Sequence, residues 1–221
     1  ERAFLEHLEA FFTARGYTCQ RQPVREGRWN LLARRGEASP RVLYSTHVDT
    51  VPPFLTPRHE AGTVYGRGAC DTKGGLLAMA EAAAALDSDE VGFLLVVGEE
   101  VDHIGAKCAE RLELERAPAR IILCEPTVNR VVRAQKGMIK LELRAEGVAA
   151  HSAYPARGDS ALHRLIDAAH ALLHADWATD DVLGETTFNV GELHGGVAAN
   201  VFAPEAVANV LARTVAPTAE Y

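Results

Sequence analysis

The spacing of apolar residues predicts that helices and strands alternate over roughly the first 130 residues. Residues 4–12 carry apolar side chains at helical spacing, which indicates an amphipathic helix. Two further helices are predicted over the Ala- and Leu-rich segment 73–86 and over 105–115. Apolar runs typical of buried strands lie between them, over 30–35, 41–51, 91–97 and 119–127. This alternation predicts an α/β fold of three layers, α/β/α, around a mostly parallel sheet.

A different pattern begins near residue 130. Residues 138–147 alternate apolar and polar side chains, as half-exposed antiparallel strands do. The following segments predict one helix and then two strands, over 160–175, 186–193 and 206–215. The order strand, helix, strand, strand is an unfinished ferredoxin-like unit, which needs another helix and strand to close. We therefore predict two domains, 1–129 and 130–221, the second an α+β domain that is incomplete at its C-terminal end.

Composition narrows the classes of partner. The 221 residues are 48% hydrophobic, enough for a sizeable core, and the net charge of -7 comes without a dense block of Lys or Arg. Nucleic acids and membrane surfaces are bound through basic faces, so small molecules or proteins are the expected partners. No apolar run approaches the ~20 residues that span a bilayer. Four widely spaced cysteines predict neither a zinc knuckle nor a disulfide framework, and they fit a reducing cytoplasm.

Ionisable side chains follow three of the predicted parallel strands. They are His47 and Asp49 after the apolar run VLYST, Glu99 and Glu100 after FLLVVG and Glu125 after IILC, joined by Asp71 at the start of the Ala-rich helix. The carboxyl ends of parallel strands share one edge of a sheet, where ligands bind, so these side chains are expected to converge. Because several carboxylates in a partly dry cleft repel one another, a cationic group is expected among them.

Two divalent metal ions balance these charges. Asp71, Glu100, Glu125 and a bridging hydroxide offset four positive charges, and neutral His47 adds a nitrogen ligand. The mixed nitrogen and oxygen donors favour zinc, with cobalt or manganese as alternatives, over calcium. Asp49, two residues beyond His47, is expected to accept a hydrogen bond from the other ring nitrogen and to fix the tautomer.

The adjacent glutamates are expected to divide two tasks. A pair of glutamates at the end of a buried strand is ordinarily just the point where the strand reaches solvent. Neighbouring residues point in different directions, however, so Glu100 can bind metal while Glu99 faces the attacking water and takes its proton.

Each of the other residues has a plainer interpretation when it is taken alone. His47 would be a structural histidine, Glu125 a solvated strand end and Asp71 a helix N-cap. Their joint placement favours the metal site. Cys70, next to Asp71, is a candidate soft ligand, but we interpret it as a small buried residue.

Four segments resemble, in order and spacing, the signatures of a known family of co-catalytic metallohydrolases. The family includes acetylornithine deacetylase, succinyl-diaminopimelate desuccinylase, aminoacylase and glutamate carboxypeptidase, and the segments are STHVDTVP, GRGACDTKGG, GEEVDHIGA and CEPT. The resemblance implies that His47 and Glu125 bind one metal and Glu100 the other, that Asp71 bridges them, and that Glu99 is the general base. This agrees with the assignment made from the residues themselves.

The resemblance continues through the second domain and so covers nearly the whole chain, in the segments GVAAHSAYPARGDSAL and GELHGGVAANVFAPEAVANVLART. It implies that 130–221 is a lid and dimerisation domain and that His151 reaches the active site of the other subunit of a homodimer, where it stabilises the oxyanion. It also implies that Asn200 and Arg213 contact the substrate, and Arg213 suits a carboxylate through a bidentate contact. Without the resemblance, each would be interpreted as a polar surface residue.

Three departures from the family pattern matter. Thr72 stands where methionine is commoner after the bridging aspartate, and Glu125 in place of aspartate is usual in the deacetylase and desuccinylase branch. The family's last metal ligand is a histidine late in the chain, which has no counterpart here. We therefore expect the 221 residues to be an incomplete copy of a longer protein.

The sequence thus predicts a dinuclear metal amidohydrolase that removes an acyl group from an N-acyl amino acid. A dipeptidase or carboxypeptidase is the alternative, since the same chemistry cleaves a peptide bond. A second alternative is a metal-binding or dimerising module without activity.

Overall fold

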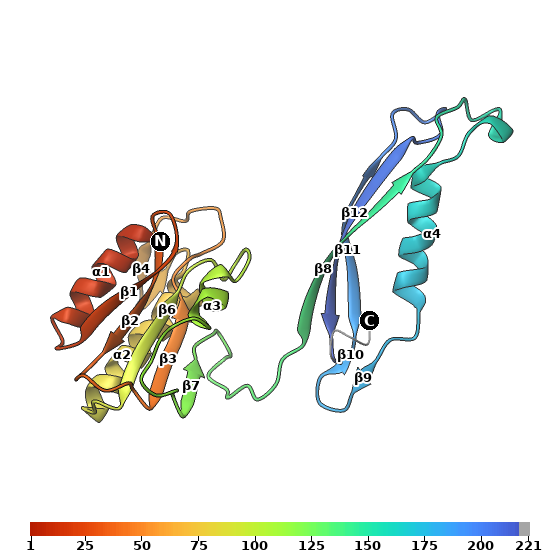
Figure 1. The fold of residues 1–221 in the computed structure, drawn as a ribbon. Coiled ribbons are helices and arrows are strands. Elements are labelled where there is room, and N and C mark those ends of the chain that lie inside the picture. Colours follow the sequence, from red (N-terminus) through yellow and green to blue (C-terminus); the bar gives the residue numbers. More distant parts are fainter. Residues whose placement is uncertain (217–221) are drawn as a thin grey trace. The chain divides into compact units, whose positions relative to one another are not determined.

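The computed structural model describes residues 1–216, which form two compact units (Figure 1). The N-terminal unit is Glu1–Arg130, and the C-terminal unit begins at Val131. Each unit has its own hydrophobic core. Among the described residues, no helix combines the length and the apolar character that crossing a membrane requires.

A mixed five-stranded sheet forms the centre of the N-terminal unit. Its strands, in spatial order, are β1 (Thr18–Arg25), β2 (Arg28–Arg34), β6 (Val91–Val96), β3 (Val42–His47) and β7 (Arg120–Leu123). The pairs β6–β3 and β3–β7 are parallel, whereas β1–β2 and β2–β6 are antiparallel. The expected mostly parallel sheet is therefore corrected to a mixed one, whose parallel part contains the strands that lead into the candidate site.

Strand β1 accounts for much of this difference. Its sequence, TCQRQPVR, is largely polar, and none of these eight residues is buried. It lies at the edge of the sheet and pairs with β2 across a tight turn at residues 26–27, which makes the pairing antiparallel. A half-exposed edge strand has no continuous apolar run, so the hydrophobic pattern did not predict it.

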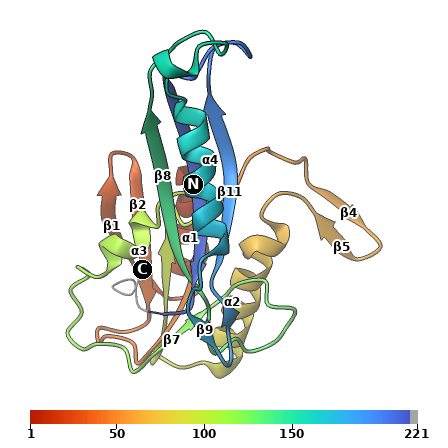
Figure 2. The ribbon, with the colours of Figure 1, turned by 90° about the vertical axis from the view of Figure 1, so that its right-hand side faces the viewer.

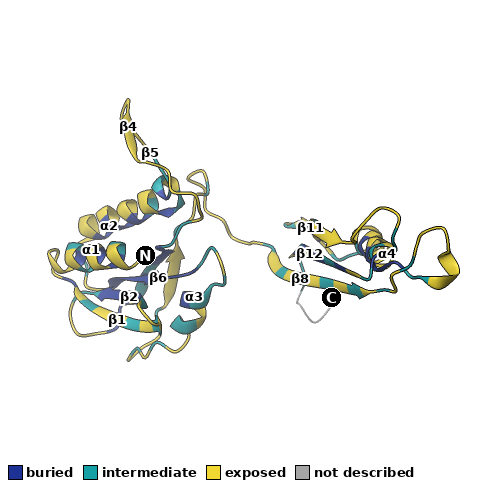
Figure 3. Ribbon diagram, turned by 90° about the horizontal axis from the view of Figure 1, so that it is seen from above, coloured by how far each residue is buried: buried dark blue, intermediate teal, exposed yellow. Residues whose placement is uncertain are grey.

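Strand β6 is buried along its whole length, which explains its unbroken apolar sequence. The helices of this unit are α1 (Arg2–Thr13), α2 (Gly75–Leu86) and α3 (Ile104–Ala109). Phe93 and Leu95 pack in the core with α1 and α2, where the ring centroid of Phe12 lies 4.6 Å from that of Phe93. Leu94 and Val96 point to the other face, toward the end of α3 and the segment after it. The sheet is therefore covered on both faces, as predicted (Figure 3).

Two connections differ from the predicted elements. Helix α3 ends at Ala109, so the helix predicted over 105–115 is too long, and Leu112 and Leu114 cover the sheet from an irregular segment instead. Between β3 and α2, a hairpin of β4 (Arg58–Glu60) and β5 (Thr63–Tyr65) projects from the unit (Figure 2). A six-residue π-helical turn, Ala69–Gly74, then leads into α2.

A buried asparagine closes the loop between β6 and α3. Asn30 Nδ2 donates to the Gly105 carbonyl (2.8 Å) and to Gln22 Oε1 (2.9 Å), and Asn30 Oδ1 accepts from the Val97 N–H (3.2 Å). Asn30→Ala is expected to lower the free energy of unfolding by about 2–5 kcal/mol, because it leaves two buried backbone groups unpaired. Chemical denaturation measures this change. The exposed Asn189 provides the control, Asn189→Ala, for which we expect less than about 0.5 kcal/mol; equal losses in both variants would contradict the role of Asn30.

The C-terminal unit is an antiparallel three-stranded sheet with one helix along it (Figure 2). In chain order its elements are β8 (Gly137–Glu146), a 3-10 turn (Pro155–Arg157), α4 (Ala161–His174), the short β9 (Thr179–Asp180) and β10 (Gly184–Glu185), β11 (Thr187–Gly195) and β12 (Glu205–Thr214). Alternate residues of β12 are buried, and Ala206 and Ala208 pack with Leu165 of α4. Apart from the short β9 and β10, which were not predicted, the order strand, helix, strand, strand is the one predicted.

Candidate metal centre

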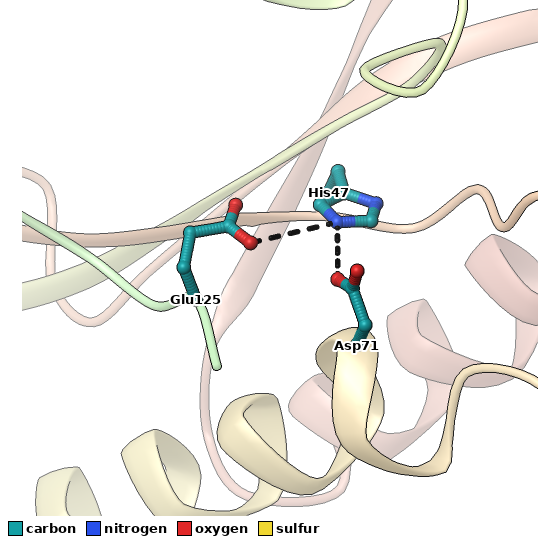
Figure 4. Close-up of side chains that lie close together, drawn as sticks. All are labelled: His47, Asp71 and Glu125. Atoms are coloured by element: carbon teal, nitrogen blue, oxygen red, sulfur yellow. Dashed lines mark hydrogen bonds and ion pairs between the residues drawn. The ribbon is translucent and has the colours of Figure 1, made fainter. Parts of the chain in front are cut away.

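Ionisable side chains meet in the N-terminal unit where β3, β6 and β7 end. Figure 4 shows three of them, His47, Asp71 and Glu125. His47 Nε2 lies 2.9 Å from Asp71 Oδ1 and 4.0 Å from Glu125 Oε2. Possible ligand atoms of these three residues all lie within 4.8 Å of one another, and the same is true of a second set, His47, Glu99 and Glu100. The structure thus brings together the side chains that the sequence predicted at this edge of the sheet.

His47 is the last residue of β3, and its side chain is only 1% exposed. Its Nδ1 lies 3.1 Å from the carbonyl oxygen of Asp49 and 3.5 Å from Asp49 Oδ1. Its Nε2 faces the carboxylates of Asp71 and Glu125. A proton on Nδ1 would be held by Asp49, which leaves the Nε2 lone pair for a metal ion. The contact between His47 and Asp49 was expected from their spacing in sequence.

Asp49 also holds the backbone that carries the two glutamates. Its Oδ1 accepts the Glu99 N–H and its Oδ2 accepts the Glu100 N–H, both at 3.0 Å. Burial raises the pKa of Asp49, but hydrogen bonds from His47 and from these two backbone groups outweigh it and lower the pKa to about 2. Asp49 is therefore an anion that fixes the ligand histidine and the Glu99–Glu100 loop at the same time. The sequence did not indicate this second contact.

The surroundings of Asp71 differ from expectation in two ways. Asp71 lies within the turn Ala69–Gly74, and the N-cap of α2 is Gly74, so Asp71 does not cap the helix. This removes the plainer interpretation of Asp71. Cys70, which was expected to be buried, is exposed, and it belongs to neither set of possible ligands within the described residues. Cys70 lies in the turn Ala69–Gly74 and not in α2, whose buried residues are Leu76, Met79, Ala80 and Ala83.

The charges and distances of the site fit a divalent cation. Burial raises the pKa of Glu125, and the carboxylates of Asp71, Glu99 and Glu100 raise it further, although His47 opposes them. A divalent ion relieves this repulsion. Two atoms bound to one zinc ion at ~2.1 Å lie roughly 3–4 Å apart, which matches the two distances from His47 Nε2. One imidazole nitrogen and several carboxylate oxygens are the donors that suit zinc, cobalt or manganese.

Glu99 has a neighbour that sequence reasoning missed. Its Oε1 lies 3.5 Å from Nδ1 of His103, and both side chains are partly exposed. The only signal in the sequence was that Glu99 and His103 are four residues apart, a spacing that brings side chains together on a helix. His103, however, precedes α3 and has a left-handed backbone. This contact follows from the shape of the loop.

The C-terminal unit places its predicted residues in two different regions. His151 forms a β-bridge with Val201, and the Ser152 N–H donates to the Asn200 carbonyl (2.9 Å), so His151 and Asn200 are neighbours before the start of β12. Arg213 pairs with Met138 of β8 and lies near the other end of β12. It lies eight positions along the strand from Glu205, a span of roughly 27 Å. One copy of this unit therefore does not bring all three side chains together.

The charge of His47 should make the stability of the metal-free protein depend on pH. The hydrogen bond with Asp49 raises the pKa of His47 from 6.5 to about 9, burial opposes this, and Asp71 and Glu125 add to the increase. Protonated His47 therefore stabilises the fold fully below pH 6.5, and this contribution is lost as pH rises through about 9. In EDTA, the Tm of the wild type should fall more between these pH values than the Tm of His47→Gln. Thermal unfolding gives Tm as a function of pH for both proteins. Parallel curves would contradict the expected interaction of protonated His47 with the neighbouring carboxylates.

Comparison with known proteins supports a relationship along the whole chain. Residues 133–220 match a family model described as the peptidase dimerisation domain. A peptidase M20 domain-containing protein of Schizosaccharomyces pombe is 35% identical over 219 residues, which cover 94% of this chain and 54% of the relative. A "Probable carboxypeptidase" of Aspergillus terreus is 37% identical over an alignment of 253 positions. This alignment covers 99% of this chain and 57% of the relative. The chain spans little more than half the length of these curated relatives.

Solved structures show the same fold. A tripeptidase from Staphylococcus aureus has a TM-score of 0.70 and 25% identity, over 97% of this chain and 61% of the other. An M20 family metallo-carboxypeptidase from Sulfolobus solfataricus has a TM-score of 0.62 over 96% and 67% of the two chains; at 13% identity, this agreement concerns the fold alone.

Proposed function

The chain belongs to the M20 peptidase family, and we propose on this basis that the whole protein is a metal-dependent hydrolase of amide bonds in small peptides. The observation that carries the proposal is the meeting of His47, Asp71 and Glu125 beside the Glu99–Glu100 loop. Imidazole nitrogen and carboxylate oxygens are donors that hold catalytic metal ions, and such ions activate water for hydrolysis.

The proposed work is divided among residues of the N-terminal unit. His47, Asp71, Glu100 and Glu125 would hold two divalent ions, most simply zinc. When bound, such ions polarise a carbonyl group and lower the pKa of water. Glu99 takes the proton of the attacking water and returns it to the leaving amine nitrogen. Asp71, Glu100 and Glu125 thus bind metal in this proposal, and Glu99 moves the proton.

Asp49 supports both tasks in this proposal. It orients His47 and holds the backbone N–H groups of Glu99 and Glu100 at 3.0 Å. Fixing that loop keeps the proton-accepting carboxylate in place relative to the metal ligands, which is what positioning contributes to a rate. Asp49 itself stays ionised and does not exchange protons with the substrate, because its pKa is held at about 2.

We propose that the substrate is a short peptide cleaved next to a residue with a free carboxylate. The relatives named carboxypeptidase and tripeptidase support this class. Removal of an acyl group from an N-acyl amino acid is the second candidate, supported by Glu125 and by the sequence segments that resemble deacylases.

Rates on matched substrates separate the two candidates. The full-length protein is assayed with dipeptides and tripeptides, with N-acetyl forms of the same amino acids, and with peptides whose terminal carboxylate is amidated. We expect the highest kcat/KM for the free peptides and a large loss on amidation. Faster hydrolysis of the N-acetyl amino acids would favour the deacylase, and no loss on amidation would contradict recognition of a carboxylate.

We also propose that the protein acts as a homodimer through the C-terminal unit. The match to a dimerisation domain supports this. His151 and Asn200 lie far from Arg213 within one copy, so a substrate that contacts all three needs residues from two copies. In this proposal Arg213 binds the substrate carboxylate and His151 stabilises the oxyanion.

The four cysteines, which all lie in the described part, are free thiols, and we propose a reducing compartment such as the cytoplasm.

A further inference from the structure

Two buried hydroxyl groups lie among the segments that carry the proposed metal ligands. Thr46 and Thr72 are 3% and 2% exposed. Thr46 immediately precedes His47, and Thr72 immediately follows Asp71. Their Oγ1 atoms are 2.7 Å apart, a hydrogen-bond distance, although the two residues are 26 positions apart in sequence. This hydroxyl pair therefore joins the end of β3 to the turn Ala69–Gly74.

The hydroxyl pair also reaches the third ligand-bearing segment. Thr46 Oγ1 lies 2.9 Å from the carbonyl oxygen of Cys124, the residue before Glu125. Thr72 Oγ1 lies 3.0 Å from the carbonyl oxygen of His47. With one proton each, the hydroxyls form a short chain in which one donates to the other and the second donates to a backbone carbonyl. Each contact of the two hydroxyls involves a residue next to a proposed metal ligand, or the backbone of the ligand His47 itself.

Such links bear directly on metal binding. A metal site accepts ligand distances only within about ±0.2 Å of their preferred values, and His47, Asp71 and Glu125 come from three segments that are distant in sequence. His47 Nε2 and Asp71 Oδ1 are already 2.9 Å apart without a metal ion in place. The hydroxyl pair is the buried side-chain connection between the backbones of these two ligands.

We propose that Thr46 and Thr72 are positioning residues that set the spacing of His47, Asp71 and Glu125 and thereby raise the affinity of the site for metal. This inference rests on the proposed function, since it takes these three residues as ligands. The contacts of the two hydroxyls are with each other and with backbone carbonyls, so their proposed effect on metal is indirect. Loss of either hydroxyl should therefore weaken metal binding while leaving all the ligands present.

Three single variants test this role. Thr72→Val keeps the shape of the side chain and removes the hydroxyl, whereas Thr72→Ser keeps the hydroxyl. Ser45→Ala is the matched control, because the Ser45 hydroxyl is also buried on β3 but donates to the Leu94 carbonyl (2.7 Å), away from the ligands. The dissociation constant of Co²⁺ is measured by calorimetry on the metal-free full-length proteins, and the visible absorption of bound Co²⁺ reports its coordination.

Thr72→Val is expected to raise the Kd for Co²⁺ by about 10- to 100-fold and to change the absorption spectrum. Thr72→Ser and Ser45→Ala should bind Co²⁺ as the wild type does. A wild-type Kd and spectrum in Thr72→Val would overturn the inference, as would an equal loss of affinity in Ser45→Ala. If the unsubstituted protein binds no Co²⁺, the proposed metal site itself fails.

A second substitution keeps the test decisive if Thr72→Val does not fold. Thr46→Val removes the other hydroxyl and should raise the Kd by a similar factor. Where both single variants fold, Thr46→Val combined with Thr72→Val should bind Co²⁺ about as weakly as either one alone, because the two hydroxyls act as one unit. Losses that multiply in the double variant would show that the hydroxyls act independently and would overturn the pairing.

Discussion

Glu99→Gln is expected to lower kcat by about 10²- to 10⁴-fold while leaving the metal content of the protein unchanged. Glutamine has the shape of glutamate but cannot accept a proton at neutral pH. The backbone of Glu99 is held by Asp49 through a 3.0 Å hydrogen bond, so the variant should keep the loop in place. Steady-state rates on the preferred peptide give kcat, and mass spectrometry of the purified variant gives its metal content.

The neighbouring glutamate provides the matched control. Glu100→Gln makes the same chemical change one residue further along the loop, whose Glu100 N–H is also held by Asp49 at 3.0 Å. It should weaken metal binding, since Glu100 is the proposed ligand, and activity should recover in part when metal is added in excess. Possible ligand atoms of Glu99, Glu100 and His47 all lie within 4.8 Å of one another, so the pair of variants tests which glutamate binds metal. If Glu99→Gln lost metal and Glu100→Gln kept it, the two assignments would have to be exchanged.

Asp71→Asn is expected to abolish the increase in thermal stability that metal gives to the wild type. A ligand present at 100 times its Kd stabilises the folded state by about 2.7 kcal/mol, which corresponds to a rise in Tm on the order of 5–10 °C. Asp71 belongs to the set of possible ligands with His47 and Glu125, lies 2.9 Å from His47 Nε2, and is the proposed bridge between two ions. Removing its charge should therefore impair both metal positions.

Thermal unfolding in EDTA and in excess zinc measures this effect as the difference between two Tm values. The comparison cancels any change that the substitution makes to the metal-free protein, which also loses a contact with His47. Glu81→Gln, an exposed glutamate on α2, is the control and should keep the full increase. An Asp71→Asn variant that gains as much from zinc as the wild type would remove Asp71 from the ligand set.

The strongly patterned elements of this fold could be predicted from sequence. Strand β6 is apolar throughout because both of its faces are covered, and α1 shows one apolar stripe because only one side faces the core. Strand β1 has no such pattern, since it lies half-exposed at the edge of the sheet. Its antiparallel pairing with β2 was therefore missed, and the sheet was expected to be more parallel than it is.

The site was predictable as far as it depends on strand direction. His47, the Glu99–Glu100 pair and Glu125 follow strands that run in parallel, so their meeting required only that the strands be recognised. The links between them were not predictable. Asp49 holds backbone groups about 50 positions away, and Thr46 contacts a carbonyl 78 positions away. Such contacts depend on how loops fold over the end of the sheet, which no local pattern encodes.

The measurement that tests the central claim most directly is the amount of zinc bound per chain after the metal-free protein is incubated with zinc and passed through a desalting column. The account predicts about two zinc ions per chain for the full-length wild type and a clear loss in Asp71→Asn. No retained zinc in the wild type, or the same amount in both proteins, would contradict a metal centre at the ends of β3, β6 and β7.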